Sequence, residues 1–229
     1  MFDNFEIPQN LIPSDPRFGC GPSLIPVEFL EALYKTGHHY MGTSHRKPGV
    51  KKVVKEIQDG LKNYFSIPND YLVVLGNGGA TLLFDMIALG LVEKKISHFT
   101  CGEFSEKWYK CSKLVPWIES SQVAVEFGHG INGSAVPGSD VIAVTLNETS
   151  TGVQLSKLPV VDAHTLLAVD ATSGGGQCPC DVSKTDIYFF SPQKVFASDG
   201  GLWIAIMSPK AMARAKKLLL ISLATFPTL

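Results

Sequence analysis

A lysine late in the chain has the surroundings of a nucleophile. Lys194 follows the apolar run YFFS and stands beside Val195 and Phe196. Apolar neighbours disfavour a charged ammonium and favour the neutral amine that a Schiff-base nucleophile needs. A solvated loop lysine is the simpler alternative. The adjoining SPQ and Gly-Gly predict a shaped, close-packed turn, so we interpret Lys194 as a functional amine.

Two other features could bind parts of a single ligand. Residues 76–81 read GNGGAT between an apolar run and a helical pattern, where free N–H groups and the helix dipole favour a phosphate. A tight turn without any ligand would need the same glycines. Asp170 ends the apolar run LLAVD, and such strand ends face the usual ligand crevice of α/β sheets. A turn or capping aspartate is an equally good interpretation of this residue alone.

Taken together, the three features describe a site for pyridoxal 5'-phosphate (PLP). The lysine would form the Schiff base, Asp170 would pair with the protonated pyridine nitrogen, and the glycine loop would hold the phosphate. Their order along the chain is as informative as the parts. A competing motif, GHGING at residues 128–133, matches GxGxxG literally. No helical pattern follows it, so we expect a hairpin or loop there and not a dinucleotide site.

The elements that must position these residues alternate between strands and helices. Apolar periodicity predicts helices over residues 27–35, 50–65, 82–91 and 105–114, with another beginning near residue 209. Short β-branched or aromatic runs predict strands over residues 71–76, 96–101, 122–127, 140–146, 166–172, 186–191 and 201–207. This alternation predicts an α/β fold with a mostly parallel central sheet flanked by helices. We expect an extended arm over residues 1–25, a PLP-binding large domain over 26–217 and a divergent or truncated tail over 218–229.

Composition narrows the classes of function. The chain has 229 residues, of which 45% are hydrophobic and 18% charged, so it can bury a large core. A net charge of -1 offers no strong field for nucleic acid or an anionic membrane. No apolar run reaches the length of a membrane helix, and the start does not read as a signal peptide. Five cysteines without metal-binding spacing predict a reduced, cytoplasmic protein with no metal site.

Seven short motifs in order resemble those of a known family. They are FGCGPS (18–23), SHR (44–46), GGAT (78–81), GEFSEKW (102–108), NET (147–149), VDATS (169–173) and SPQK (191–194). In these the chain resembles class V aminotransferases of PLP fold type I, and most closely the phosphoserine aminotransferase family. The resemblance implies the fold type I large domain. It also implies that Lys194 forms the Schiff base and shuttles the proton, while Asp170 pairs with the pyridine nitrogen.

The resemblance implies further cofactor contacts. Phe104 would stack on the PLP ring, with Trp108 as a rival, and Thr149 would hydrogen-bond the ring hydroxyl. The phosphate would be held by residues of the glycine loop and of the lysine turn, with a helix cap beside them: Gly79, Ala80, Thr81 and Gln193.

Substrate contacts are implied on the N-terminal side. Arg46 and His45 would bind the phosphate and carboxylate of the substrate, since a guanidinium forks well onto oxyanions. In this family that loop can serve the active site of a partner subunit; a solvated basic loop is the alternative. Cys20 stands where the family often has Ser near the substrate carboxylate, which weakens that contact. Ala80 stands where some members carry Arg.

The implied reaction is reversible amino transfer between L-glutamate and 3-phosphohydroxypyruvate in serine biosynthesis, by a homodimer. A related four-carbon phospho-ketoacid of pyridoxine biosynthesis is a second implied substrate. Family members continue into a small C-terminal domain, which we expect to be missing here. Two alternatives stay open: another class V PLP enzyme, or an inactive truncated product. A desulfurase is disfavoured because no cysteine follows Lys194.

Overall fold

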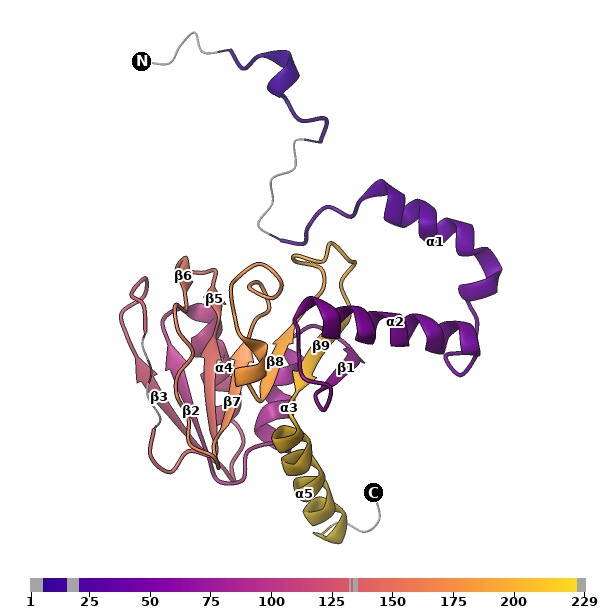
Figure 1. The fold of residues 1–229 in the computed structure, drawn as a ribbon. Coiled ribbons are helices and arrows are strands. Elements are labelled where there is room, and N and C mark those ends of the chain that lie inside the picture. Colours follow the sequence, from indigo (N-terminus) through magenta and orange to yellow (C-terminus); the bar gives the residue numbers. More distant parts are fainter. Residues whose placement is uncertain (1–5, 16–20, 132, 134–135, 226–229) are drawn as a thin grey trace.

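A seven-stranded sheet forms the centre of the molecule (Figure 1). The computed structural model describes residues 6–15, 21–131, 133 and 136–225. The strands follow the order β1-β9-β8-β7-β4-β2-β3 across the sheet. Their bounds are β1 (Leu72–Asn77), β2 (Lys95–Thr100), β3 (Glu119–Ala124), β4 (Val141–Thr145), β7 (Leu166–Asp170), β8 (Ile187–Phe190) and β9 (Leu202–Met207). A separate two-stranded ribbon pairs β5 (Asn147–Glu148) with β6 (Val153–Gln154).

Strand direction decides where the loops meet. The pairs β2–β3, β2–β4, β4–β7 and β7–β8 are parallel, whereas β9 is antiparallel to both β8 and β1. Because β1 and β8 both oppose β9, they run in the same direction. The carboxyl ends of β1, β2, β4, β7 and β8 therefore meet along one edge of the sheet. This confirms the predicted α/β fold with a mostly parallel sheet.

Helices lie on both faces of the sheet, and one helix stands apart from it. They are α1 (Val27–Tyr40), α2 (Pro48–Tyr64), α3 (Leu82–Gly90), α4 (Glu103–Lys113) and α5 (Pro209–Thr225), with short 3₁₀ turns η1 (Gln9–Leu11) and η2 (Val182–Lys184). Successive residues of a strand point to opposite faces, so β4 places Val141 and Ala143 against α3 and α4. Its Ile142 and Val144 join the opposite cluster with Leu61 of α2.

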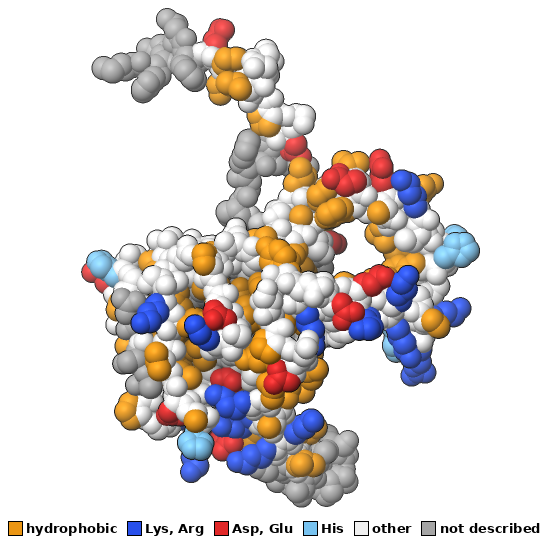
Figure 2. All heavy atoms as spheres, in the orientation of Figure 1, with side chains coloured by type: hydrophobic (Ala, Val, Ile, Leu, Met, Phe, Trp, Pro, Cys, Tyr) orange, Lys and Arg blue, Asp and Glu red, His pale blue; other side chains and the backbone are white. Residues whose placement is uncertain are grey.

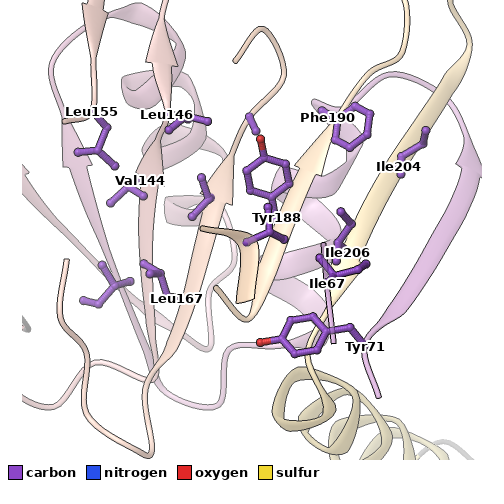
Figure 3. Close-up of a cluster of buried hydrophobic side chains, with 14 of the residues drawn as sticks. Ile67, Tyr71, Val144, Leu146, Leu155, Leu167, Tyr188, Phe190, Ile204 and Ile206 are labelled. Atoms are coloured by element: carbon purple, nitrogen blue, oxygen red, sulfur yellow. The ribbon is translucent and has the colours of Figure 1, made fainter. Parts of the chain in front are cut away.

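The cluster on the α2 face is drawn in Figure 3. Tyr188 and Phe190 of β8 lie between side chains of β4 and β7 on one side and Ile204 and Ile206 of β9 on the other (Figure 3). All four side chains are buried. Complete burial on both faces explains why these strands read as continuous apolar runs in the sequence.

Helix α1 differs from the rest of the fold. It extends to Tyr40, beyond the predicted end at residue 35, across non-helical backbone at Gly37 (φ +47). No residue of α1 is buried, and the helix stands away from the sheet (Figure 1). Figure 2 shows hydrophobic side chains on the surface in this part of the molecule. The described part of residues 1–25 contains one short 3₁₀ turn, η1, and no longer helix or strand.

Some predicted boundaries move. Strand β3 begins at Glu119, three residues before the predicted start, because Glu119 pairs in register with Lys95 of β2. Helix α5 continues through residue 218, so the predicted start of a divergent tail is not marked by a break in the backbone. The described residues of GHGING lie in the loop between β3 and β4, as expected. No helix in the described part of the chain is long and apolar enough to cross a membrane.

Candidate active site

A small cavity of about 80 Å³ lies where the carboxyl ends of the strands meet. Five predicted site residues line it, and each follows a different strand: Thr81 after β1, Phe104 after β2, Thr149 after β4, Asp170 at the end of β7 and Lys194 after β8. A larger hollow of about 650 Å³ lies between the segment after β6 and the segment before η2, and no predicted site residue lines it. The chemistry of the lining residues, and not the volume, therefore identifies the candidate site.

Asp170 is the buried acid of the cavity. One carboxylate oxygen accepts hydrogen bonds from the Thr172 amide, at 2.9 Å, and from the Thr172 hydroxyl. The other oxygen has no hydrogen bond among the described residues. Burial raises the pKa of Asp170 to about 6, the nearby Glu148 charge adds to this, and the Thr172 hydrogen bonds oppose it. A buried carboxylate with an open oxygen facing a cavity fits a cationic N–H donor, such as a protonated pyridine.

The backbone around Lys194 is held by a segment far away in the chain. The Ser23 amide donates to the Gln193 carbonyl at 2.8 Å, and the Ser23 hydroxyl donates to the Lys194 carbonyl. Phe196 stacks on Phe190 with ring centroids 5.2 Å apart. These contacts give the shaped turn that the sequence predicted. The lysine side chain is half-buried and lines the cavity.

The glycine loop is shaped by the strand that follows the lysine. A Cβ atom on Gly76 would lie 2.2 Å from the Trp203 ring, so only glycine fits there. Gly78 has a φ of +111°, which favours glycine, and its amide donates to the Gly201 carbonyl at 2.9 Å. The loop therefore turns sharply into α3, as predicted.

One of the predicted phosphate contacts has another partner in this structure. The Ala80 amide donates to the Ser191 hydroxyl at 2.8 Å, and Ala80 is buried and does not line the cavity. Phosphate binding by Ala80 stays a prediction. Thr81 is the N-cap of α3 but makes no side-chain cap bond, contrary to prediction, and it lines the cavity. Gly79 is exposed beside it.

Gln193 does not line the cavity. Its side-chain Oε1 is buried without a hydrogen bond among the described residues. Its backbone carbonyl instead accepts the amide of Ser23. The predicted contact between Gln193 and a cofactor phosphate stays a prediction.

The structure separates the two candidate aromatic residues. Phe104 is 47% exposed and lines the cavity. Trp108 is buried in the core, where it stacks on Phe84 with ring centroids 5.0 Å apart. Of these two residues, Phe104 lines the cavity and Trp108 belongs to the core.

The predicted substrate residues lie elsewhere. His45 and Arg46 are exposed in the turn between α1 and α2, and neither lines the cavity. Figure 1 shows this turn projecting away from the sheet. Cys20 lies outside the described residues. The structure thus assembles five of the predicted cofactor residues at the cavity and leaves His45 and Arg46 apart from them.

Sequence reasoning missed half of the cavity lining. The missed residues are Phe84, Thr145, Asn147, Thr172 and Ser173. Asn147, Thr172 and Ser173 lay within quoted motifs, and the Asn147 amide donates to the Ser173 hydroxyl at 3.1 Å. For Thr145, the end of β4 at the shared edge was the available signal. For Phe84 the helical pattern indicated only a core residue.

The chain is similar in sequence to known proteins. No protein-family model matches the chain. A phosphoserine aminotransferase of Corynebacterium glutamicum is 48% identical over 220 residues, which are 95% of this chain and 58% of that protein. Another, of Nocardioides, is 47% identical and is covered over 59% of its length. The chain thus spans less than two thirds of these curated relatives.

Solved structures of phosphoserine aminotransferases are also similar to this chain. The phosphoserine aminotransferase of Cytophaga hutchinsonii superposes with a TM-score of 0.80 at 28% identity, over 88% of this chain and 58% of that one. A phosphoserine aminotransferase studied for radiation damage of its Schiff base gives a TM-score of 0.71 at 26% identity, over 83% and 56% of the two chains.

The fold and the cavity define the class of protein. The chain has the α/β architecture of the PLP fold type I aminotransferases, with the cavity at the carboxyl ends of the strands. Within that class it resembles phosphoserine aminotransferases over nearly its whole length.

Proposed function

We propose that this chain carries the cofactor site of a PLP-dependent phosphoserine aminotransferase. Such an enzyme transfers the amino group between L-glutamate and 3-phosphohydroxypyruvate and yields O-phospho-L-serine in serine biosynthesis. The observation that carries the proposal is the convergence of Lys194, Asp170, Phe104 and Thr149 on one cavity. Asp170 ends a strand, the other three residues each follow a different strand, and a relative that carries this name matches 95% of the chain.

The cavity residues divide the binding of PLP among them. The open oxygen of Asp170 would accept the pyridine N–H, and the resulting ion pair would bring the pKa of this acid back down. Phe104 would pack against the ring, and the Thr149 hydroxyl would donate to the ring oxygen. Gly79 and Thr81 would bind the phosphate at the N-terminus of α3, where free amides and the helix dipole favour an anion.

Lys194 carries the chemistry that the protein itself supplies. When bound, PLP supplies an electron sink that withdraws charge from the α-carbon of the amino-acid substrate. The Lys194 amine would hold the cofactor covalently and then act as the base that moves the proton at that carbon. Asp170 would maintain the protonated state of the ring that this withdrawal needs.

The substrate side requires a second copy of the chain. Arg46 and His45 would bind the substrate phosphate and carboxylate in the partner's cavity, because they lie away from the cavity of their own chain. The exposed apolar residues of α1, including Phe29, Leu30 and Leu33, support such a homodimer. A cytoplasmic location is supported by the free thiols of the described cysteines. The proposed function includes a four-carbon phospho-ketoacid as a second substrate.

Labelling of Lys194 tests the proposal. The chain is incubated with PLP and reduced with borohydride, and the labelled peptide is located by mass spectrometry. We expect the label on Lys194 of the unaltered chain. In Lys194→Ala the label should be lost, and the aminotransferase activity should fall at least about 10²-fold. Lys184→Ala is the matched control because Lys184 is an exposed lysine that lies outside the cavity and pairs with Asp181.

Two outcomes would count against the proposal. A label on another lysine, or a label that persists in Lys194→Ala, would overturn the cofactor site. A correct label without formation of 2-oxoglutarate from glutamate and 3-phosphohydroxypyruvate would retain the cofactor site and reject the proposed activity for this chain.

A further inference from the structure

A buried acid stands directly behind the cavity and is not one of its lining residues. Glu148 forms part of β5, between Asn147 and Thr149, both of which line the cavity. Its side chain is completely buried, at 0% exposure. A buried carboxylate is costly unless it is hydrogen-bonded, so its partners indicate what it does.

Among the described residues, the Glu148 carboxylate accepts four hydrogen bonds, which come from two short segments. Oε1 accepts from the Phe104 amide at 3.2 Å and from the Ser150 hydroxyl at 2.6 Å. Oε2 accepts from the Ser105 amide at 2.9 Å and from the Ser105 hydroxyl at 2.8 Å. Burial alone would raise the pKa of Glu148, but hydrogen bonds from Ser150, Ser105 and Phe104 outweigh it and lower the pKa. The carboxylate is therefore held in its charged form.

The amides bound by Glu148 belong to the first turn of α4. In any helix these N–H groups lack partners within the helix, and a negative charge beside them is favoured by the helix dipole. The Glu103 amide is also bound, by the Ser150 hydroxyl at 2.9 Å. Three successive amides of α4 are thus bound by side chains of the segment that follows β4. The start of α4 and the Asn147–Thr149 wall of the cavity are joined into one unit.

The backbone is shaped to admit this contact. A Cβ atom on Gly102 would lie 2.4 Å from Cγ of Glu148 and 2.6 Å from the Ser150 hydroxyl. Glycine at the N-cap of α4 therefore lets the two segments approach closely. Phe104 follows two residues later, with its amide bound to Glu148 and its ring at the cavity.

We propose that Glu148 is a positioning residue that clamps the start of α4 to the segment after β4, and so fixes the Phe104 ring and Thr149 against the cofactor. This rests on the proposed function, since the ring that Phe104 faces is that of PLP. Glu148 touches neither the cavity nor, in this proposal, any substrate. Its effect passes through Phe104 and Thr149.

Amide exchange tests the clamp without any cofactor. Hydrogen–deuterium exchange of the peptide around residues 102–106 is followed by mass spectrometry in the full chain. We expect Glu148→Gln to accelerate exchange there by about tenfold or more, the scale of a lost charge-assisted hydrogen bond. Glu103→Gln is the matched control, because Glu103 is an exposed acid of the same helix turn. Ser105→Ala removes one clamp bond and gives a second, milder variant should Glu148→Gln fold poorly.

PLP binding tests the positioning role. We expect Glu148→Gln to weaken PLP binding by about tenfold and to reduce the visible circular dichroism of bound PLP, which reports a fixed ring. Glu148→Asp should restore part of the dichroism because it keeps the charge. Unchanged exchange in Glu148→Gln would overturn the clamp. Faster exchange with unchanged PLP affinity and dichroism would overturn the positioning role. No PLP bound to the unaltered chain would reject the proposed function, while the exchange data would still decide the clamp.

Discussion

The carboxyl edge of the sheet and helix α1 are built in opposite ways. At the edge, the carboxyl ends of six co-directed strands meet, and three of these strands, β4, β7 and β8, are buried along their whole length. Helix α1 buries no residue, and Phe29, Leu30 and Leu33 are 45–53% exposed. Five residues predicted to bind PLP line the cavity at the first region, whereas His45 and Arg46, predicted to bind substrate, follow the second. We propose that one chain provides the cofactor site, whereas substrate binding needs a second copy that covers α1.

The largest expected effect compares a core side chain with one on α1. Phe189 is completely buried and packs on Trp108 and Phe84, with ring centroids 5.3 and 6.1 Å apart. We expect Phe189→Ala to lower the free energy of unfolding by about 3–5 kcal/mol. Leu33→Ala on α1 should change it by no more than about 0.5 kcal/mol in the monomer. Urea unfolding followed by circular dichroism measures the free energy of unfolding of both variants. Similar losses in the two variants would show that α1 is packed in solution and would contradict the contrast between α1 and the core.

The next effect is the pH dependence that the cavity itself creates. Without PLP, the pKa of Asp170 rises from 3.8 to about 6, so the folded chain binds this proton more tightly than the unfolded chain. Its contribution to stability is fully present below pH 3.8 and is lost as the pH rises through 6. Relative to Asp170→Asn, the unaltered chain should lose on the order of 3 kcal/mol between pH 4 and pH 7.

Urea unfolding at several pH values checks this difference between the two chains. The subtraction removes the titration of groups that both chains share. Saturating PLP should abolish most of the loss in the unaltered chain, because a cationic pyridine would stabilise the Asp170 carboxylate. Parallel pH profiles for the two chains would contradict the raised pKa.

The smallest expected effect concerns self-association through α1. A glutamate at position 33 would place a charge in the apolar face that we propose is covered by a second copy. We expect Leu33→Glu to weaken dimerisation by at least about tenfold, or roughly 1.4 kcal/mol. Sedimentation analysis over a range of concentrations measures it, with Lys35→Glu as a control that adds the same residue to the same helix. Equal weakening by both variants would indicate a charge effect and not an apolar interface.

Much of the site could be predicted because its residues follow strands. Asp170 and Lys194 each follow an apolar run, and parallel strands bring such ends to one edge whatever their separation along the chain. The glycine loop was recognisable for the same reason. The Glu148 clamp could not be predicted from local pattern, since NET and GEFSEKW are over 40 residues apart and neither motif indicates the other. Likewise, nothing near Ala80 indicates that Ser191 binds its amide.

The order of strands and helices, the fold class and the residue types at the strand ends can be predicted from the sequence. These follow from local periodicity and from the burial of apolar runs. Three other features needed the folded chain: Phe104 and not Trp108 lines the cavity, the Ala80 amide has a partner in Ser191, and Arg46 lies away from the cavity of its own chain. Each of these depends on which distant segments pack together, because a side chain or amide is free for a ligand only where no other part of the fold has taken it.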